Sequence, residues 1–132
     1  MDSSRLLIIG PVGQLGSALR ARFPEAPAHD VDTLDITDWE ALSKFSWNTV
    51  DTIVNAAAYT DVDGAQKPAG RAMAWQINAQ AVAHLSRISS SNSITLVHIS
   101  TDYVFDGTKS PHSEDEPFTP LASMVRVKLP EI

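Results

Sequence analysis

Residues 6–16 read Leu6-Leu7-Ile8-Ile9-Gly10-Pro11-Val12-Gly13-Gln14-Leu15-Gly16. The four apolar residues are typical of a buried strand, and the glycine-rich turn after them leads into a helix. This spacing suits a dinucleotide, because Gly10 allows a sharp turn, Gly13 leaves room for phosphates and Gly16 lets helix and strand pack closely. Free backbone N–H groups at the helix start would face the anion. An ordinary strand-turn-helix also favours glycine here, so evidence for a dinucleotide site must come from the rest of the chain.

The composition limits the class of protein. The chain has 132 residues, 43% of them hydrophobic, and we expect one domain over residues 1–132. Its net charge is -6 and its Lys and Arg residues are scattered, which argues against a nucleic-acid surface or a basic membrane patch. No stretch approaches the roughly 20 apolar residues of a membrane span, and we expect a cytoplasmic protein.

Metal and thiol chemistry are not expected. The chain has no cysteine, so disulfides, thiolate catalysis and cysteine-ligated zinc are excluded. The other histidines show no metal-ligand spacing with His98, which lies inside an apolar run and reads as a core residue. The sequence therefore predicts no metal site.

Predicted strands and helices alternate along the chain. Helical patterns cover Gln14 to Phe23, a segment from Thr37 as N-cap to about Phe45, and Pro68 to about Ser90. Strand patterns lie near Ala26 to Asp30, over Val50 to Val54, and over Ile94 to Ile99, the last of the buried kind. This order predicts an α/β fold with a parallel sheet covered on both faces. Residues 106–122 are acidic and proline-rich, which indicates a surface loop.

Ligands of parallel sheets bind beyond the carboxyl ends of the strands, so the residues after each apolar run are candidates for the site. Asp30 follows the second predicted strand, where its carboxylate could accept hydrogen bonds from an adenosine ribose. No Arg or Lys stands beside it to receive a 2′-phosphate, which gives a weak preference for NADH over NADPH. Asp30 and Asp32 fit equally well as turn formers.

Two more segments follow predicted strands. Residues 55–59 carry three small alanines, as the approach of a flat cofactor requires, although alanines also fill cores. Ser100 and Thr101 begin an octet that runs to Gly107, and two adjacent hydroxyls there can hydrogen-bond a substrate carbonyl. The alternative is that both hydroxyls only cap the strand. The three tryptophans read as packing residues, namely Trp39, Trp47 and Trp75.

These motifs together resemble the dTDP-4-dehydrorhamnose reductases, a family of extended short-chain dehydrogenase/reductases. The matching segments follow one another along the whole chain, at residues 10–16, 34–38, 54–60, 62–63, 78–79, 100–107, 111–115 and 120–121. The resemblance implies a doubly wound parallel sheet, the Rossmann NAD(P)-binding fold. It also implies an activity, since in this family NAD(P)H reduces the C4 ketone of dTDP-4-dehydro-L-rhamnose to give dTDP-L-rhamnose.

The resemblance further implies residue roles. The pyrophosphate would be held by Gly10, Val12, Gly13, Gln14 and Leu15, while Asp35 and Ile36 would border the adenine. The nicotinamide half would lie along Ala57, Ala58 and Tyr59. Ser100 and Thr101 would touch the sugar, with Thr101 orienting the carbonyl, and Lys128 would bind the nicotinamide ribose.

The sequence departs from the family pattern in two ways. A tyrosine four residues before Lys128 should supply the proton, but that position is Met124, whose thioether has no proton to donate. Loss of a positioned general acid costs about 10²–10⁴ in rate. Residues 123–132 would begin the catalytic helix, and family members continue beyond them into a lobe that grips the nucleotide-sugar. We therefore expect weak or absent turnover by this chain alone.

Other interpretations stay open. The chain could be a non-catalytic NAD(P)-binding module that binds a partner enzyme, similar to the regulatory subunit of methionine adenosyltransferase, or a remnant without activity. A sheet that ends on a strand normally covered by later elements would expose an apolar edge. For that reason we expect self-association or completion by another chain.

Overall fold

A four-stranded parallel sheet forms the centre of the computed structural model, which describes residues 2–119. Its order is β2-β1-β3-β4, with strands β1 (Leu6–Ile9), β2 (Ala28–His29), β3 (Thr52–Asn55) and β4 (Thr95–His98). Ile9 lies opposite His29 on one side and Asn55 on the other, and Asn55 lies opposite His98. The carboxyl ends of all four strands therefore align at one edge of the sheet.

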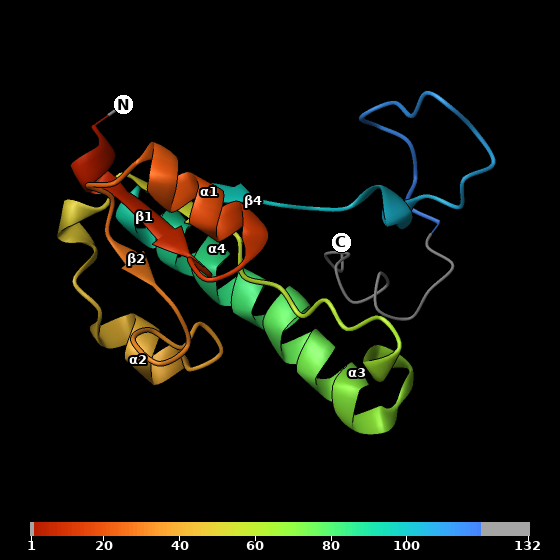
Figure 1. Cartoon of the computed structure of the whole chain (residues 1–132), viewed down its shortest axis with the longest axis horizontal. Coiled ribbons are helices and arrows are strands. Elements are labelled where there is room, and N and C mark those ends of the chain that lie inside the picture. Colours follow the sequence, from red (N-terminus) through yellow and green to blue (C-terminus); the bar gives the residue numbers. More distant parts are fainter. Residues whose placement is uncertain (1, 120–132) are drawn as a thin grey trace.

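Helices cover both faces of this sheet, as predicted. The described residues form helices α1 (Gln14–Arg22), α2 (Trp39–Lys44), α3 (Pro68–Trp75) and α4 (Ala81–Asn92). Of these, α1 packs on β1 and α4 on β4, α2 packs on α4, and α3 extends beyond the sheet (Figure 1). Figure 1 shows α1 in front of the sheet and α4 behind it. Because all four residues of β1 are buried, the strand needs apolar side chains on both faces, which explains the uninterrupted run of leucine and isoleucine.

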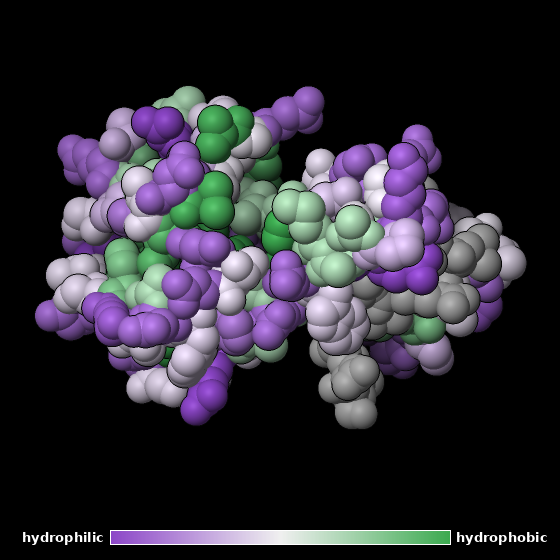
Figure 2. Space-filling view, turned by 90° about the horizontal axis from the view of Figure 1, so that it is seen from below, coloured by the Kyte–Doolittle hydropathy of each residue, from purple (hydrophilic) through white to green (hydrophobic). Residues whose placement is uncertain are grey.

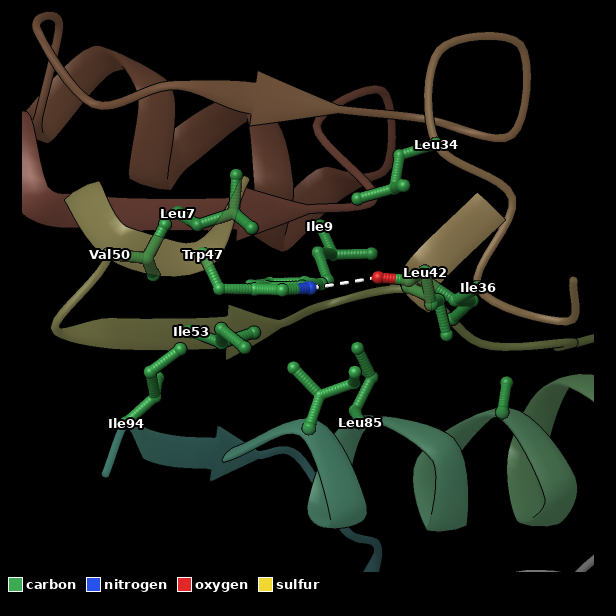
Figure 3. Packing of buried hydrophobic residues seen from close by; sticks show 12 residues of the cluster. Leu7, Ile9, Leu34, Ile36, Leu42, Trp47, Val50, Ile53, Leu85 and Ile94 are labelled. Atoms are coloured by element: carbon green, nitrogen blue, oxygen red, sulfur yellow. Dashed lines mark hydrogen bonds between the residues drawn. The ribbon is translucent and has the colours of Figure 1, made fainter. Parts of the chain in front are cut away.

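The main core lies between the sheet and the layer that contains α4 (Figure 3). Leu7, Ile9 and Ile53 come from the sheet, and Leu85 meets them from α4. Trp47 packs into the same cluster, and its indole N–H donates a 2.8 Å hydrogen bond to the carbonyl of Leu42. The polar atom of this large buried side chain is thereby satisfied.

Most predicted elements are present, with shifted boundaries. The second strand shrinks to Ala28–His29, and the third runs over Thr52–Asn55 rather than Val50 to Val54. Asp38, not Thr37, caps α2, because its carboxylate accepts hydrogen bonds from the N–H groups of Glu40 and Ala41 at 2.8 and 3.2 Å. The hydroxyl of Thr37 donates instead to Asp35, at 2.7 Å.

The long helix predicted from Pro68 exists but contains an irregular turn. α3 and α4 are joined by a π-helical segment, η4 (Gln76–Gln80), so the helix continues to Asn92 with one widened turn. Such turns are rare and often occur at functional sites. The prediction that Trp75 is a packing residue is wrong, because 45% of its surface is exposed.

β4 is an edge strand rather than a buried one. Among the residues that the structure describes it pairs only with β3, and Val97 on its open face is 41% exposed. The prediction of a fully buried strand is wrong because no layer covers this face within residues 2–119. The expected apolar edge is present, while self-association through it stays a prediction.

The chain after β4 leaves the sheet as an extended segment and then folds back on itself (Figure 1). Residues 106–119 contain no helix or strand, which agrees with the predicted surface loop. Two contacts join this segment to the residues just before it. The ring of Phe105 stacks on that of His112 with 3.9 Å between the ring centroids, and the N–H of Thr119 donates a 2.8 Å hydrogen bond to the carbonyl of Val104. These contacts close the loop.

The face of the molecule drawn in Figure 2 is mainly polar. In the view of Figure 2, hydrophilic residues cover most of the molecule and hydrophobic ones surface in small areas between them. No helix within residues 2–119 has the length and apolar character needed to cross a membrane.

Candidate functional site

A groove of about 410 Å³ lies at the edge of the sheet where β1, β2 and β3 end. It brings together eight residues predicted for the cofactor site, namely Gly10, Val12, Gly13, Asp30, Asp35, Ile36, Ala57 and Ala58. Its other lining residues include Met73, Gln76 and Ile77 from α3 and η4. Short side chains and backbone on one side and an apolar helix face on the other make a slot that suits a flat, elongated ligand.

Gly10 and Gly16 are needed by the fold itself. Gly10 has a φ of +79°, and a Cβ there would lie 2.6 Å from the backbone nitrogen of Ala57. A Cβ on Gly16 would collide with the carbonyl of Gly10, which explains how α1 packs so closely on the turn. Protein packing alone therefore accounts for these two glycines.

Gly13 is different. Its φ of -71° and ψ of 172° are open to any residue, and a Cβ there would come no closer than 4.0 Å to another atom. Neither strain nor packing within residues 2–119 requires glycine at this position. Gly13 is exposed and lines the groove, so the space above it is available to a ligand.

The start of α1 offers hydrogen-bond donors to that space. Gly13 is the N-cap, and no side-chain hydrogen bond caps the helix within the part of the chain that the structure describes. The first N–H groups of a helix have no partner inside it, and the helix dipole makes this end favourable for an anion. Gln14 and Leu15 do not line the groove with their side chains, and their backbone N–H groups lie in this first turn.

Asp30 and Asp35 both line the groove, and each also shapes its own turn. One carboxylate oxygen of Asp30 lies 3.2 Å from the N–H of Asp32 and from the hydroxyl of Thr33. One oxygen of Asp35 accepts from the N–H of Thr37 at 2.8 Å. The interpretation of Asp30 as a turn former is confirmed. Because a carboxylate has a second oxygen, the ribose interpretation is compatible with it.

A buried asparagine from the π-helical turn holds the loop after β3. Asn78 is 2% exposed, accepts a 2.8 Å hydrogen bond from the N–H of Tyr59 and donates one of 3.0 Å to the carbonyl of the same residue. These bonds join residues 19 positions apart. The widened turn at η4 places the amide where it can reach both groups.

Asn55 supports the other end of this loop. Its side-chain carbonyl accepts from the N–H of Ala57 at 3.1 Å, and its amide nitrogen lies 3.3 Å from Nδ1 of His98 on the neighbouring strand. His98 thus has a polar partner, but it is half-buried on the edge strand and is not part of the core, so the prediction of a core residue is wrong. The two asparagines fix the backbone that forms one wall of the groove.

Tyr59 points away from the groove. A Cβ built on Gly64 or Gly70 would lie 2.7 or 2.9 Å from the Tyr59 hydroxyl, which therefore packs against the turn before α3 and the helix itself. The hydroxyl also hydrogen-bonds to Asp61. Burial, together with the negative charge of Asp61, raises the pKa of the Tyr59 hydroxyl above its usual value.

We expect this environment to make stability depend on pH in alkaline solution. Because the folded state favours the protonated phenol, the unfolded chain loses its proton first, at a pKa of about 10. The protonated Tyr59 hydroxyl therefore contributes its full stabilisation of the folded state below that pH. This stabilisation is lost as the pH rises through the higher pKa of the folded state. Urea unfolding at pH 9 and pH 11 should show a larger loss of stability for the natural chain than for Tyr59→Phe. Equal losses would contradict the assignment.

Several predicted site residues lie elsewhere. Ser100 and Thr101 follow β4 at the same edge of the sheet but do not line the groove, and the hydroxyl of Thr101 lies 3.3 Å from the Asp102 carboxylate. Lys128 and Met124 fall outside the described residues. Within residues 2–119 no three His, Asp or Glu side chains form a cluster that could hold a metal ion.

Sequence reasoning missed the outer wall of the groove. Met73, Gln76 and Ile77 recur at helical spacing, a signal that marks one face of a helix. The pattern does not say which strand ends this helix face will meet, because that depends on where α3 and η4 lie relative to the sheet. Asn78 belongs to a segment that matches the reductase family, but the sequence assigned it no role.

Comparison with known proteins identifies the family. The model of the RmlD substrate binding domain matches residues 4–130, nearly the whole chain. This chain belongs to the RmlD family. A dTDP-4-dehydrorhamnose reductase of Mycobacterium tuberculosis is 38% identical over 122 residues, covering 89% of this chain and 39% of the relative.

Solved structures of RmlD-family proteins share the fold. A dTDP-4-dehydrorhamnose reductase from Clostridium acetobutylicum superposes with a TM-score of 0.85 at 34% identity, over 93% of this chain and 45% of that one. One from Bacillus anthracis, in complex with NADP, superposes with a TM-score of 0.83 at 32% identity, over 94% and 46%. The chain thus has the NAD(P)-binding Rossmann part of this fold. It spans less than half the length of these relatives.

Proposed function

We propose that this chain binds NADH or NADPH in the groove, with the diphosphate over Gly13. The observation that carries the proposal is that Gly13 lacks a side chain although nothing within residues 2–119 requires glycine there. Its neighbours supply unpaired helix N–H groups, and the groove continues past Asp30 and Asp35 toward the apolar face of Met73 and Ile77. The complex of the Bacillus anthracis relative with NADP supports the same assignment.

The bound dinucleotide would supply hydride for reduction of a ketone. By likeness to its relatives we propose the C4 ketone of dTDP-4-dehydro-L-rhamnose as the group reduced, in the synthesis of dTDP-L-rhamnose. Thr101 would orient the carbonyl, Ser100 would bind the sugar and Lys128 would hold the nicotinamide ribose. With Met124 at the position of the proton donor, weak or absent turnover is expected for this chain alone.

The second candidate function is a non-catalytic NAD(P)-binding module that regulates or binds a partner. Met124 favours it, since a thioether cannot replace a phenol as general acid. An assay of ketone reduction separates the two candidates: activity that appears in Met124→Tyr but is absent in the natural chain supports a disabled reductase. Dinucleotide binding without turnover in both proteins supports the binding module.

The dinucleotide proposal predicts that Gly13→Val strongly weakens binding without unfolding the protein. The new side chain would fill the space above the helix start. Charge-assisted hydrogen bonds contribute about 1.5–3 kcal/mol each, so a loss of about 100-fold in affinity for NADPH and NADH is expected. Stability should fall by no more than about 1 kcal/mol, because the backbone angles there suit any residue.

The matched control is Ala18→Val, which creates the same side chain at an exposed position of α1 that does not line the groove. Fluorescence titration with both nucleotides and urea unfolding should be carried out on the natural chain and both variants. Natural affinity in Gly13→Val, with the fold intact, would exclude a diphosphate above this residue.

A further inference from the structure

A second hollow, of about 630 Å³, lies between α1 and the β2 region. Its lining includes Ser17 and Arg20 from α1 and Asp30 and Thr33 from the chain after β2. Asp30 lines both this hollow and the groove, so the two cavities adjoin at this residue. Arg20 and Asp30 are the charged residues of the lining.

Arg20 is available to an anion. The ion pairs of the described residues use Arg5, Lys44, Lys109 and His112, and Arg20 makes none with a carboxylate of residues 2–119. A guanidinium presents five N–H donors in a planar fork, an arrangement that suits a phosphate monoester. The hydroxyls of Ser17 and Thr33 border the same space.

The hollow beside Asp30 suits a phosphate group on the adenosine ribose. In the proposed binding mode the adenosine ribose lies at Asp30, and its 2′-hydroxyl faces that carboxylate. NADPH carries at this oxygen a phosphate with a charge of about -2, which needs a cation within reach. Beyond Asp30, the hollow supplies both the room and the guanidinium.

We infer that the hollow is a subsite for the 2′-phosphate of NADPH and that Arg20 determines the use of this nucleotide. The inference rests on the proposed dinucleotide function and deepens it. The preference for NADH that the sequence indicates assumes that no basic residue stands beside Asp30. α1 brings Arg20, ten positions earlier in the chain, to the same hollow, so that assumption does not hold in three dimensions.

Asp30 opposes the phosphate electrostatically while it holds the ribose. One of its oxygens is engaged with the N–H of Asp32 and the hydroxyl of Thr33, and an asparagine could keep both contacts through its carbonyl. Asp30→Asn therefore removes the charge and preserves the turn. The balance between Arg20 and Asp30 sets the choice of nucleotide.

The test compares 2′,5′-ADP with 5′-AMP, which differ only by the 2′-phosphate, using calorimetric titration. The natural chain is expected to bind 2′,5′-ADP about tenfold more tightly than 5′-AMP. Arg20→Gln should abolish this advantage and leave the affinity for 5′-AMP unchanged. Asp30→Asn should increase the advantage.

Arg22→Gln is the matched control, because it removes the same charge from the same helix at a residue that lies over the Phe23 ring and does not line the hollow. It should keep the natural ratio of the two affinities. An unchanged ratio in Arg20→Gln, with 5′-AMP still bound, would overturn the inference alone. Failure of the natural chain to bind either nucleotide would overturn the inference together with the proposed function.

Discussion

Replacing Gly10 by alanine is expected to lower the free energy of unfolding by about 3–5 kcal/mol. Two costs combine at this position. A φ of +79° is strained for any residue with a Cβ, and the added atom would lie 2.6 to 2.9 Å from backbone atoms of Ala56 and Ala57. Since these are backbone atoms of a loop held by two buried asparagines, they cannot move aside cheaply. Urea unfolding should report a lower transition midpoint.

Gly107 provides a control with the same backbone strain and no crowding. Its φ is +76°, and a Cβ there would meet no atom within 4 Å. Gly107→Ala should therefore cost only about 1–2 kcal/mol, the price of the left-handed backbone alone. The difference between the two variants measures the close approach of the β1 turn to the loop after β3. Equal losses would show that no such contact exists.

The variant Asn78→Ala is expected to destabilise the protein by about 2–4 kcal/mol and to weaken dinucleotide binding. Alanine leaves the N–H and carbonyl of Tyr59 without their partners, and each unsatisfied buried group costs about 1–3 kcal/mol. The freed loop carries Ala57 and Ala58, which line the groove. In this variant the loop would not be held in place in the free protein, so binding would have to order this wall of the groove and would be weaker.

The comparison variant is Asn92→Ala. Asn92 makes one side-chain hydrogen bond, 2.8 Å to the carbonyl of Ile88, at an exposed helix end far along the chain from the groove residues. The free energy of unfolding of Asn92→Ala should fall by less than about 1 kcal/mol, and this variant should bind NADPH normally. Unfolding and nucleotide titration on both variants decide the matter. Normal binding by Asn78→Ala, in protein that remains folded, would show that the loop needs no such support.

The sequence predicted well the features that depend on neighbours in the chain. The run before Gly10 is apolar at every position, so it had to be a strand buried on both faces, and Pro24 ends α1 because proline cannot continue a helix. For Asp30 the sequence left two roles open, a turn former and a ligand of the adenosine ribose. The structure shows that Asp30 shapes its turn and also lines the groove, while the ribose contact stays a prediction.

Predictions failed where a distant part of the chain makes the decision. β4 has the composition of a buried strand, yet its exposure depends on which elements cover it, and Val97 is open among the residues described. Trp75 reads as a core residue by its size, but α3 extends beyond the sheet and leaves this side chain at the surface. Periodicity reports the faces of a helix and not the partner that each face meets.

What the sequence alone determined is the order of strands and helices, the parallel α/β class and the glycine turn, because these follow from backbone sterics and from apolar periodicity over a few residues. Only the tertiary structure brought Asn78 to the backbone of Tyr59 and Arg20 into one hollow with Asp30. It also distinguished Gly13 from Gly10 and Gly16. Those outcomes depend on distances between segments far apart in the chain, which are set by how helices pack across the whole sheet and which no local pattern contains.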